Sequence, residues 1–226
     1  MNRVASLLAI APALALGCTN APAILPRAIV DVDVRPSFLP TITAGSCAFG
    51  PGSDLVSVGC AGTASRCTDN DDGSFLAVAH GARAAGDGTP DGRGGEVHVY
   101  CAVTRVGTAF DIRLSALRYD AEKPTEKLEQ LTIEGRVDPA ATEDQQVTVS
   151  AFKRGTAAFV TNPPGLATGS HTGLGCVISC PEATYMHIAP GRIWARVSCP
   201  DAYIPGSDPV RMCDVSGTFR FENCTD

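Results

Sequence analysis

Apolar and polar residues alternate along many short segments of this chain, and this pattern constrains its fold more than any other sequence feature. Val97, Val99 and Val103 lie on one side of such an alternation, and His98 and Tyr100 lie on the other. Successive side chains of a β-strand point to opposite faces, so the alternation predicts strands with one buried face. No segment after the first 17 residues shows helical periodicity, and the sequence therefore predicts an all-β protein.

Short segments of this kind recur along the chain, and clusters of Gly, Pro, Asn and Asp separate them. Segment 121–129 contains Pro124 and is expected to form a turn or a short helix. Strands at this spacing favour an antiparallel two-sheet sandwich, jelly-roll-like and stapled by disulfides, with a closed barrel as the alternative. The expected strands are 28–34, 55–60, 75–82, 96–106, 110–117, 128–137, 147–152, 157–160, 177–179, 185–188, 193–199 and 218–222.

The start of the chain has the layout of an export signal. Arg3 supplies a positive charge, residues 4–16 form an apolar run, and Gly17 and Cys18 follow. The run is shorter than the roughly 20 apolar residues that a membrane-spanning helix needs. We therefore expect the chain to be exported and to carry no transmembrane helix.

Residues 14–18, Leu-Ala-Leu-Gly-Cys, resemble the lipobox of bacterial lipoproteins, although Ala15 stands where that family prefers leucine. The resemblance implies cleavage before Cys18 and its acylation, by palmitate or a similar fatty acid, so that the lipid bilayer is the first partner. Thr19 stands where aspartate commonly retains such lipoproteins at the inner membrane, and the outer membrane is therefore expected. The alternative is cleavage after Ala23, which would release a soluble secreted or periplasmic protein.

This interpretation divides the chain into three parts. Residues 1–17 are the signal peptide, residues 18–26 are a lipidated tether, and residues 27–226 are a single β-sandwich domain large enough to bury a core. The closing segment 197–224 resembles that of exported cysteine-rich lipoproteins, and the resemblance implies no particular activity.

Ten cysteines are present, and in an exported chain such a density is typical of disulfides. Without Cys18 nine remain, an odd number, so one thiol is left free, modified or paired between molecules. Cys199 and Cys213 flank a loop rich in Pro and Gly and are candidates to close it. Cys176 and Cys180 are expected to pair with later cysteines rather than to bind a metal. The remaining five are Cys47, Cys60, Cys67, Cys101 and Cys224.

A candidate binding patch surrounds the only tryptophan. In a strand at 193–199, Trp194 shares one face with Arg192 and Arg196, opposite the apolar residues between them. Aromatic faces and guanidinium groups suit an anionic ligand or a sugar. The plainer interpretation is an aromatic ring packed beneath arginine stems.

Two other groups of residues are candidate sites. Carboxylates gather in two Gly-containing loops, which makes calcium a weak candidate cofactor, although ordinary polar turns use the same residues. Glu96, His98 and Tyr100 share the outward face of a strand, where an acid–base site is imaginable and a plain polar face is the simpler interpretation. The calcium candidates are Asp69, Asp71, Asp72, Asp87 and Asp91.

The remaining features favour a binding or structural role over catalysis. The net charge of −6 gives no electrostatic drive toward nucleic acid. No motif of a serine hydrolase, zinc protease, phosphate-binding loop or dinucleotide fold occurs. We expect an envelope lipoprotein whose partner is an envelope protein or a glycan; a hydrolase of envelope or extracellular polymer is the alternative.

Overall fold

All regular secondary structure in the described part of the chain is β-strand, as the alternating pattern predicts. The computed structural model describes residues 24–36, 54–58, 78–81, 95–120, 122–141, 145–153, 159–160, 167–168, 171–172, 176–203 and 212–226. Within these residues no helix is long and apolar enough to cross a bilayer.

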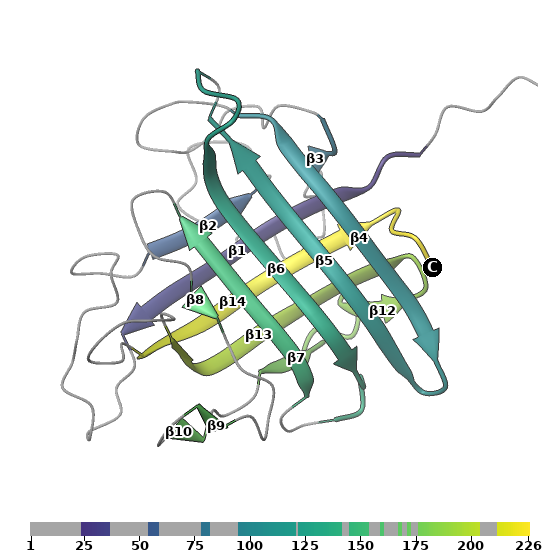
Figure 1. The fold of residues 1–226 in the computed structure, drawn as a ribbon. Coiled ribbons are helices and arrows are strands. Elements are labelled where there is room, and N and C mark those ends of the chain that lie inside the picture. The colour runs from purple at the N-terminus through teal and green to yellow at the C-terminus, as the bar shows by residue number, and fades with distance from the viewer. Residues whose placement is uncertain are drawn as a thin grey trace, which may run out of the picture.

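Four consecutive antiparallel strands form one layer of the protein, drawn in teal to green in Figure 1. Each strand pairs with the next along the chain, so this layer is a simple meander. Short connections such as the turn at Gly107, where φ is 66°, make neighbours of strands that are adjacent in sequence. The strands are β4 (Val97–Val106), β5 (Ala109–Tyr119), β6 (Lys127–Val137) and β7 (Gln146–Lys153).

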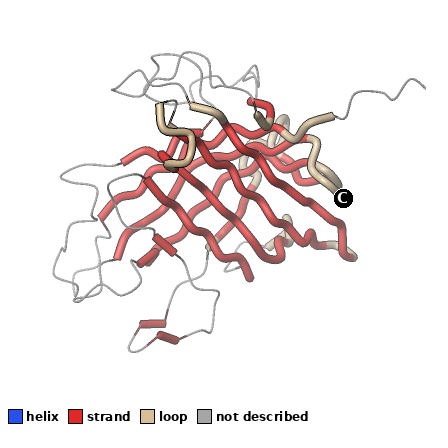
Figure 2. The backbone as a smooth tube through the Cα atoms, turned by 45° about the horizontal axis from the view of Figure 1, so that its top comes forward, coloured by secondary structure: helices blue, strands red, loops and turns tan. Residues whose placement is uncertain are grey.

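The second layer joins the two ends of the chain. Strand β14 (Met212–Glu222) pairs on one side with β1 (Arg27–Pro36) and on the other with β13 (Arg192–Tyr203), all antiparallel. These strands cross behind the first layer at a large angle (Figures 1 and 2). Shorter strands extend the layer: β2 (Asp54–Val58) and β3 (Val78–Ala79) pair with β1, and β11 (Val177–Ser179) and β12 (His187–Ala189) pair with β13.

The two layers are connected through the two-residue strand β8 (Phe159–Val160), which pairs with both β7 and β13. The hydrogen-bonded path runs β2-β1-β14-β13-β8-β7-β6-β5-β4 and, among the described strands, does not close on itself. The prediction of an antiparallel two-layer sandwich is therefore confirmed over the barrel. A separate antiparallel pair is formed by β9 (Ala167–Thr168) and β10 (His171–Thr172).

The core lies between the layers and is built from the inward residue of each alternation. Phe219 and Phe221 of β14 are the largest fully buried side chains, and their rings meet at 6.2 Å. They pack in one cluster with the valines of β1 and the aliphatic residues of the front layer, such as Leu114 and Ile133. Burial of each such side chain contributes about 1.5–3 kcal/mol, which is why the alternation selects these strands.

The outer edge of β4 is covered by other parts of the chain. The backbone N–H of Gly81 donates to Val97 O, and the imidazole of His80 lies 3.0 Å from Val99 O through Nδ1. Farther along, the Thr225 N–H donates to Cys101 O. These contacts occupy backbone groups that an exposed edge strand would offer to another chain.

Two disulfides are formed among the described residues, and one of them agrees with an expected pairing. Cys101 bonds Cys224, with Cα atoms 4.8 Å apart, and so ties the front layer to the end of the chain. Cys176 bonds Cys199, which lies directly across the β11–β13 pair. The prediction that Cys199 and Cys213 close a loop was wrong, because the register of β11 and β13 places Cys199 beside Cys176. Cys213 is itself disulfide-bonded.

The expected pairing of Cys180 with a later cysteine was also wrong, since its thiol is free. Cys180 lies beyond the end of β11, and its half-buried thiol contacts the backbone oxygen of Trp194 at 3.6 Å. The expectation for Cys176 was right, and its partner Cys199 is a later cysteine.

Several strand boundaries also differ from the expected ones. Residues 122–126 turn around the Asp120 carboxylate, as the turn alternative predicted, and β6 begins at Lys127, one residue earlier than expected. Strand β13 continues through Pro200 to Tyr203 by means of an irregular register after Cys199. Proline has no backbone N–H to donate to the ladder, so a strand accommodates it best at such an irregularity.

Candidate functional site

Trp194 lies on the outer face of the rear layer, meaning the face turned away from the front layer. Its neighbours along β13, Ile193 and Ala195, are buried in the core, so the alternation predicted the direction of Trp194 correctly. Across the sheet Trp194 is paired with Arg220 of β14 on one side and with His187 of β12 on the other. Three strands therefore contribute to its surroundings.

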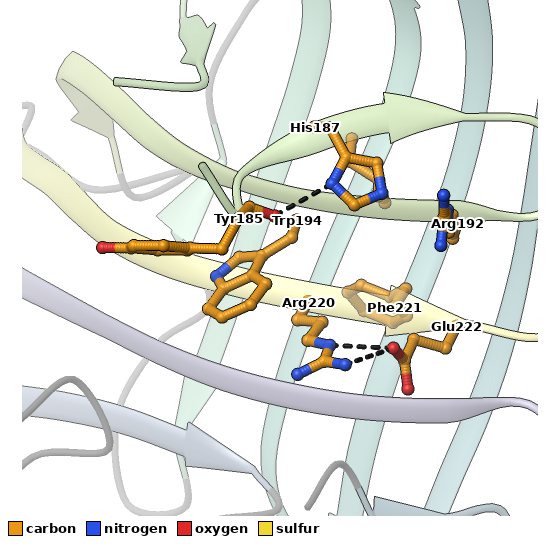
Figure 3. Close-up of a pocket in the computed structure, with 8 residues that line it drawn as sticks. Tyr185, His187, Arg192, Trp194, Arg220, Phe221 and Glu222 are labelled. Atoms are coloured by element: carbon orange, nitrogen blue, oxygen red, sulfur yellow. Dashed lines mark hydrogen bonds and ion pairs between the residues drawn. The ribbon is translucent and has the colours of Figure 1, made fainter. Parts of the chain in front are cut away.

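The indole ring is held between an aromatic ring and a guanidinium group. The Tyr185 ring lies 4.6 Å from the Trp194 ring, and the Arg220 guanidinium carbon lies 4.7 Å from the ring centroid (Figure 3). A guanidinium over an indole face is attracted by the negative face of the ring. The Trp194 ring is thus packed with an arginine, as in the plainer interpretation, but this arginine is Arg220 of β14 and not Arg192 or Arg196.

Trp194 also borders a pocket of about 220 Å³ that opens on the outer face. Its polar lining groups include Arg192 and an ion pair in which Arg220 Nε donates to Glu222 Oε1 at 2.9 Å. In Figure 3, Arg192 lies apart from the Trp194 ring, and the Arg220–Glu222 ion pair lies alongside these two residues on the neighbouring strand β14. The full lining is Tyr185, His187, Arg192, Ile193, Trp194, Arg220, Phe221 and Glu222.

The structure brings together two of the three residues of the predicted patch. Arg192 and Trp194 line the same pocket. Arg196 lies two residues beyond Trp194 along β13, where it pairs with Thr218, and it does not line the pocket. Arg192 and Arg196 are exposed, and neither has an ion-pair partner among the described residues.

The charges of this site are therefore unbalanced. Glu222 partners Arg220, but Arg192 and Arg196 keep two guanidinium groups available on the same face. Guanidinium groups bind carboxylate and phosphate oxygens in a bidentate manner. Since the aromatic pair Tyr185 and Trp194 offers a flat apolar surface beside them, the site has the chemistry to hold an anion that also carries a flat or sugar-like face.

A second hollow, of about 460 Å³, lies on the outer face of the front layer, and its charges balance each other. Arg136 donates to both Asp111 oxygens, at 2.7 and 3.1 Å, and this contact holds the pKa of the Asp111 carboxyl below its ordinary value. Arg113 and Glu134 are paired in the next row of the sheet. Because each arginine stands opposite a carboxylate, this hollow is a weaker anion site than the Trp194 pocket.

The predicted outward face of β4 is present, but it lies on the other side of the sandwich from Trp194. His98 Nε2 is 2.9 Å from Glu96 Oε1, and the His98 ring packs against Tyr119 and His80 at 4.9 and 5.0 Å. His80 in turn packs against Tyr100 at 5.2 Å. These contacts form a packed polar surface and do not converge with the Trp194 pocket.

The other candidates lie outside the described residues. These are Cys18 and the calcium candidates Asp69, Asp71, Asp72, Asp87 and Asp91. In the part of the chain that the structure describes, no three His, Cys, Asp or Glu side chains gather as a metal ion would require.

Four polar or aromatic residues of the pocket were missed by the sequence interpretation: Tyr185, His187, Arg220 and Glu222. Strand pairing and the turn before β12 bring them to Trp194, and the register between distant strands cannot be predicted from local alternation. One signal was available, since Arg220 and Glu222 alternate with Phe219 and Phe221 and had to face outward once those phenylalanines were assigned to the core.

Comparison of the chain with protein-family models, with curated proteins and with solved structures found no match. Two disulfides in the described residues indicate an oxidising, extracytoplasmic location.

Proposed function

We propose that this chain is an outer-membrane lipoprotein, anchored by acylated Cys18, whose β-sandwich binds an anionic ligand at the Trp194 pocket. The observation that carries the proposal is the pairing of a flat aromatic wall, Tyr185 and Trp194, with the exposed Arg192, which makes no ion pair with another described residue, around one hollow. An aromatic wall takes the face of a sugar or another planar group, and the guanidinium takes its carboxylate or phosphate.

Support for the anchor comes from the start of the sequence. A basic residue, an apolar run and Gly17-Cys18 have the lipoprotein layout, and the disulfides agree with the export that such a signal would provide. A soluble protein released after Ala23 is the alternative. Labelling cells with a fatty-acid analogue separates the two: label on the wild type that disappears in Cys18→Ala supports the anchor, and label that persists without Cys18 contradicts it.

The single tryptophan makes the binding proposal directly measurable, because all indole fluorescence comes from Trp194. Titration with glucuronate, an anionic sugar, is expected to change the emission saturably, whereas glucose at equal concentration has a much smaller effect. Arg192→Gln is expected to weaken glucuronate binding about tenfold, since a hydrogen bond to a charged group contributes about 1.5–3 kcal/mol. Arg113→Gln, an exposed arginine of the front layer, is the matched control.

A second variant is expected to change the affinity for glucuronate in the opposite direction. Glu222→Gln removes the carboxylate that partners Arg220, so more positive charge reaches the pocket and glucuronate is expected to bind more tightly. Equal emission changes with glucose and glucuronate, or no change with either, would contradict an anion site at Trp194.

A further inference from the structure

Four arginines lie on one end of the outer face of the rear layer, and together they define what we call the arginine face: Arg27, Arg192, Arg196 and Arg220, with Trp194 among them. Register places them in adjacent rows. Arg27 of β1 pairs with Glu222, which stands beside Arg192, and Trp194 pairs with Arg220 in the next row. Neighbouring strands lie about 4.8 Å apart, so these groups share one contiguous surface.

The arginine face carries excess positive charge on an acidic protein. The whole chain has a net charge of −6, yet this surface holds four guanidinium groups against two carboxylates, those of Glu222 and of the buried Asp31, which stands in the row of Thr218 and Arg196. Arg27, Arg192 and Arg196 are exposed and make no ion pair with another described residue. Glu222 is thus the only acidic side chain within the rows that hold Arg27, Arg192, Trp194 and Arg220.

Apolar residues border the arginine face where the chain enters the domain. Ile24 and Leu25 are 77% and 49% exposed, and they are two of the four exposed large hydrophobic residues in the described part of the chain. Leu25 is held beside the end of β14, because the Asn223 side-chain amide donates to its backbone oxygen at 3.1 Å. Exposed apolar residues next to basic ones are the combination that binds the interface of an anionic bilayer.

The proposed anchor holds this surface near a membrane. Arg27 follows Cys18 by nine residues, which span at most about 32 Å when fully extended. The arginine face therefore cannot leave the vicinity of the bilayer to which Cys18 is attached, and phosphate groups are the anions found there at highest density.

We propose that the arginine face binds phosphate-bearing lipid headgroups of the membrane that holds the anchor, with Trp194 and Tyr185 at the headgroup level. This inference rests on the proposed function and names the ligand class of the same site. It predicts a domain docked on the bilayer by one face instead of a domain that swings freely on its tether.

The test uses the full-length protein in vesicles of phosphatidylcholine alone or with increasing phosphatidylglycerol, and reads Trp194 emission and its quenching by acrylamide. With phosphatidylglycerol, the emission is expected to shift to shorter wavelength and quenching to fall, because the indole leaves water. Removing one arginine is expected to raise the phosphatidylglycerol content needed for half of this protection about fivefold.

Matched variants assign the effect to the arginine face. The double variant Arg192→Ala, Arg196→Ala is expected to lose the protection. Arg105→Ala, Arg113→Ala removes the same charge from exposed positions of the front layer and is expected to keep it. Equal urea midpoints for the two double variants exclude loss of folding as the cause.

A parallel arm with glycerol phosphate and glucuronate in solution separates the inference from the proposed function. A response to these soluble anions, with no more protection in phosphatidylglycerol than in phosphatidylcholine, overturns the headgroup inference and leaves the anion pocket standing. No response in either arm overturns both. Protection that survives loss of Arg192 and Arg196 also overturns the inference.

Discussion

At the scale of single residues, Trp194 shows how one side chain acquires its surroundings from three strands. Alternation along β13 sends it outward, pairing with β14 places Arg220 over its face, and the turn before β12 places Tyr185 beside it. The first of these could be predicted from sequence, since it depends only on the residues adjacent to Trp194. The other two could not, because they depend on the pairing of distant strands.

The Asp111–Arg136 pair gives a prediction about pH. The hydrogen bond from Arg136 lowers the pKa of the Asp111 carboxyl in the folded protein. A lowered carboxyl pKa contributes stability above the unfolded pKa, and this contribution is lost as pH falls through the folded pKa. In an NMR titration, Arg136→Gln is expected to return the Asp111 pKa toward 3.8.

Arg113→Gln serves as the control, because Arg113 is the weakest of the causes that lower the Asp111 pKa, and its loss should move the pKa less. Both carboxyl and guanidinium are exposed to solvent, so the change in unfolding free energy is expected to be small. An unchanged Asp111 pKa in Arg136→Gln would contradict the assignment.

Cys180 gives a prediction about thiol chemistry. Burial raises the pKa of this thiol above its ordinary value of 9.0, so little thiolate exists at neutral pH. Alkylation of Cys180 by iodoacetamide, followed by peptide mass spectrometry, is expected to be slow in the folded protein and much faster in urea. Equal rates in the two conditions would show that the native fold does not shield the thiol.

At the scale of elements, the sequence predicted the strands of the front layer to within two residues at either end, and β11 without error. One face of each of these strands is buried, and this imposes a strict alternation of apolar and polar residues. The boundaries of the strands can therefore be predicted from the local sequence. Strand β14 was predicted only from residue 218, whereas it begins at Met212, because Gly217 stands at an inward position and interrupts the alternation. Pairing with both β1 and β13 overrides this weak local preference.

Gly217 shows why a residue unfavourable in strands is required inside β14. A Cβ atom at this position would lie 2.1 Å from the backbone oxygen of Asp31 and 2.6 Å from Val32 Cα in β1. We expect Gly217→Ala to destabilise the protein by about 3 kcal/mol, since the backbone of β1 must shift to admit the methyl group. The measurement is urea unfolding.

The neighbouring variant Thr218→Ala is the control for Gly217→Ala. Thr218 lies half-buried on the same strand, and its truncation adds no atoms against β1, so a loss below about 1 kcal/mol is expected. If the two variants were equally stable, the close approach of β14 and β1 at Gly217 would be wrong.

At the scale of the whole molecule, the sandwich is held together across its layers by a covalent link. The Cys101–Cys224 disulfide joins β4 of the front layer to the residues after β14 of the rear layer, across a sequence separation of 123. Cys176–Cys199 spans only 23 positions within the rear layer. Cysteine content predicted that disulfides exist, but their pairing is a property of the tertiary fold and could not be obtained from spacing.

The two disulfides are expected to differ in their contribution to stability. In the chain-entropy model, the longer loop contributes about 5 kcal/mol and the shorter one about 3.5 kcal/mol. The double variant Cys101→Ser, Cys224→Ser should therefore unfold at lower urea than Cys176→Ser, Cys199→Ser. The reverse order would contradict a role for Cys101–Cys224 in joining the layers.

The proposed function also belongs to this scale, because it requires the proposed anchor, the tether and the arginine face to act together. Sequence predicted the export signal and two members of the pocket, Arg192 and Trp194. It did not predict the excess charge of the arginine face, since Arg27 and Arg220 come from opposite ends of the chain and meet only through the β1–β14–β13 pairing.

The intact mass of the protein purified from its native membrane fraction tests the central claim, a binding module anchored at Cys18, most directly. Our account predicts a polypeptide that begins at Cys18 and carries the added mass of a diacylglycerol group, with or without a third acyl chain. A polypeptide that begins at Ile24 with no lipid mass, recovered from the soluble fraction, would contradict it.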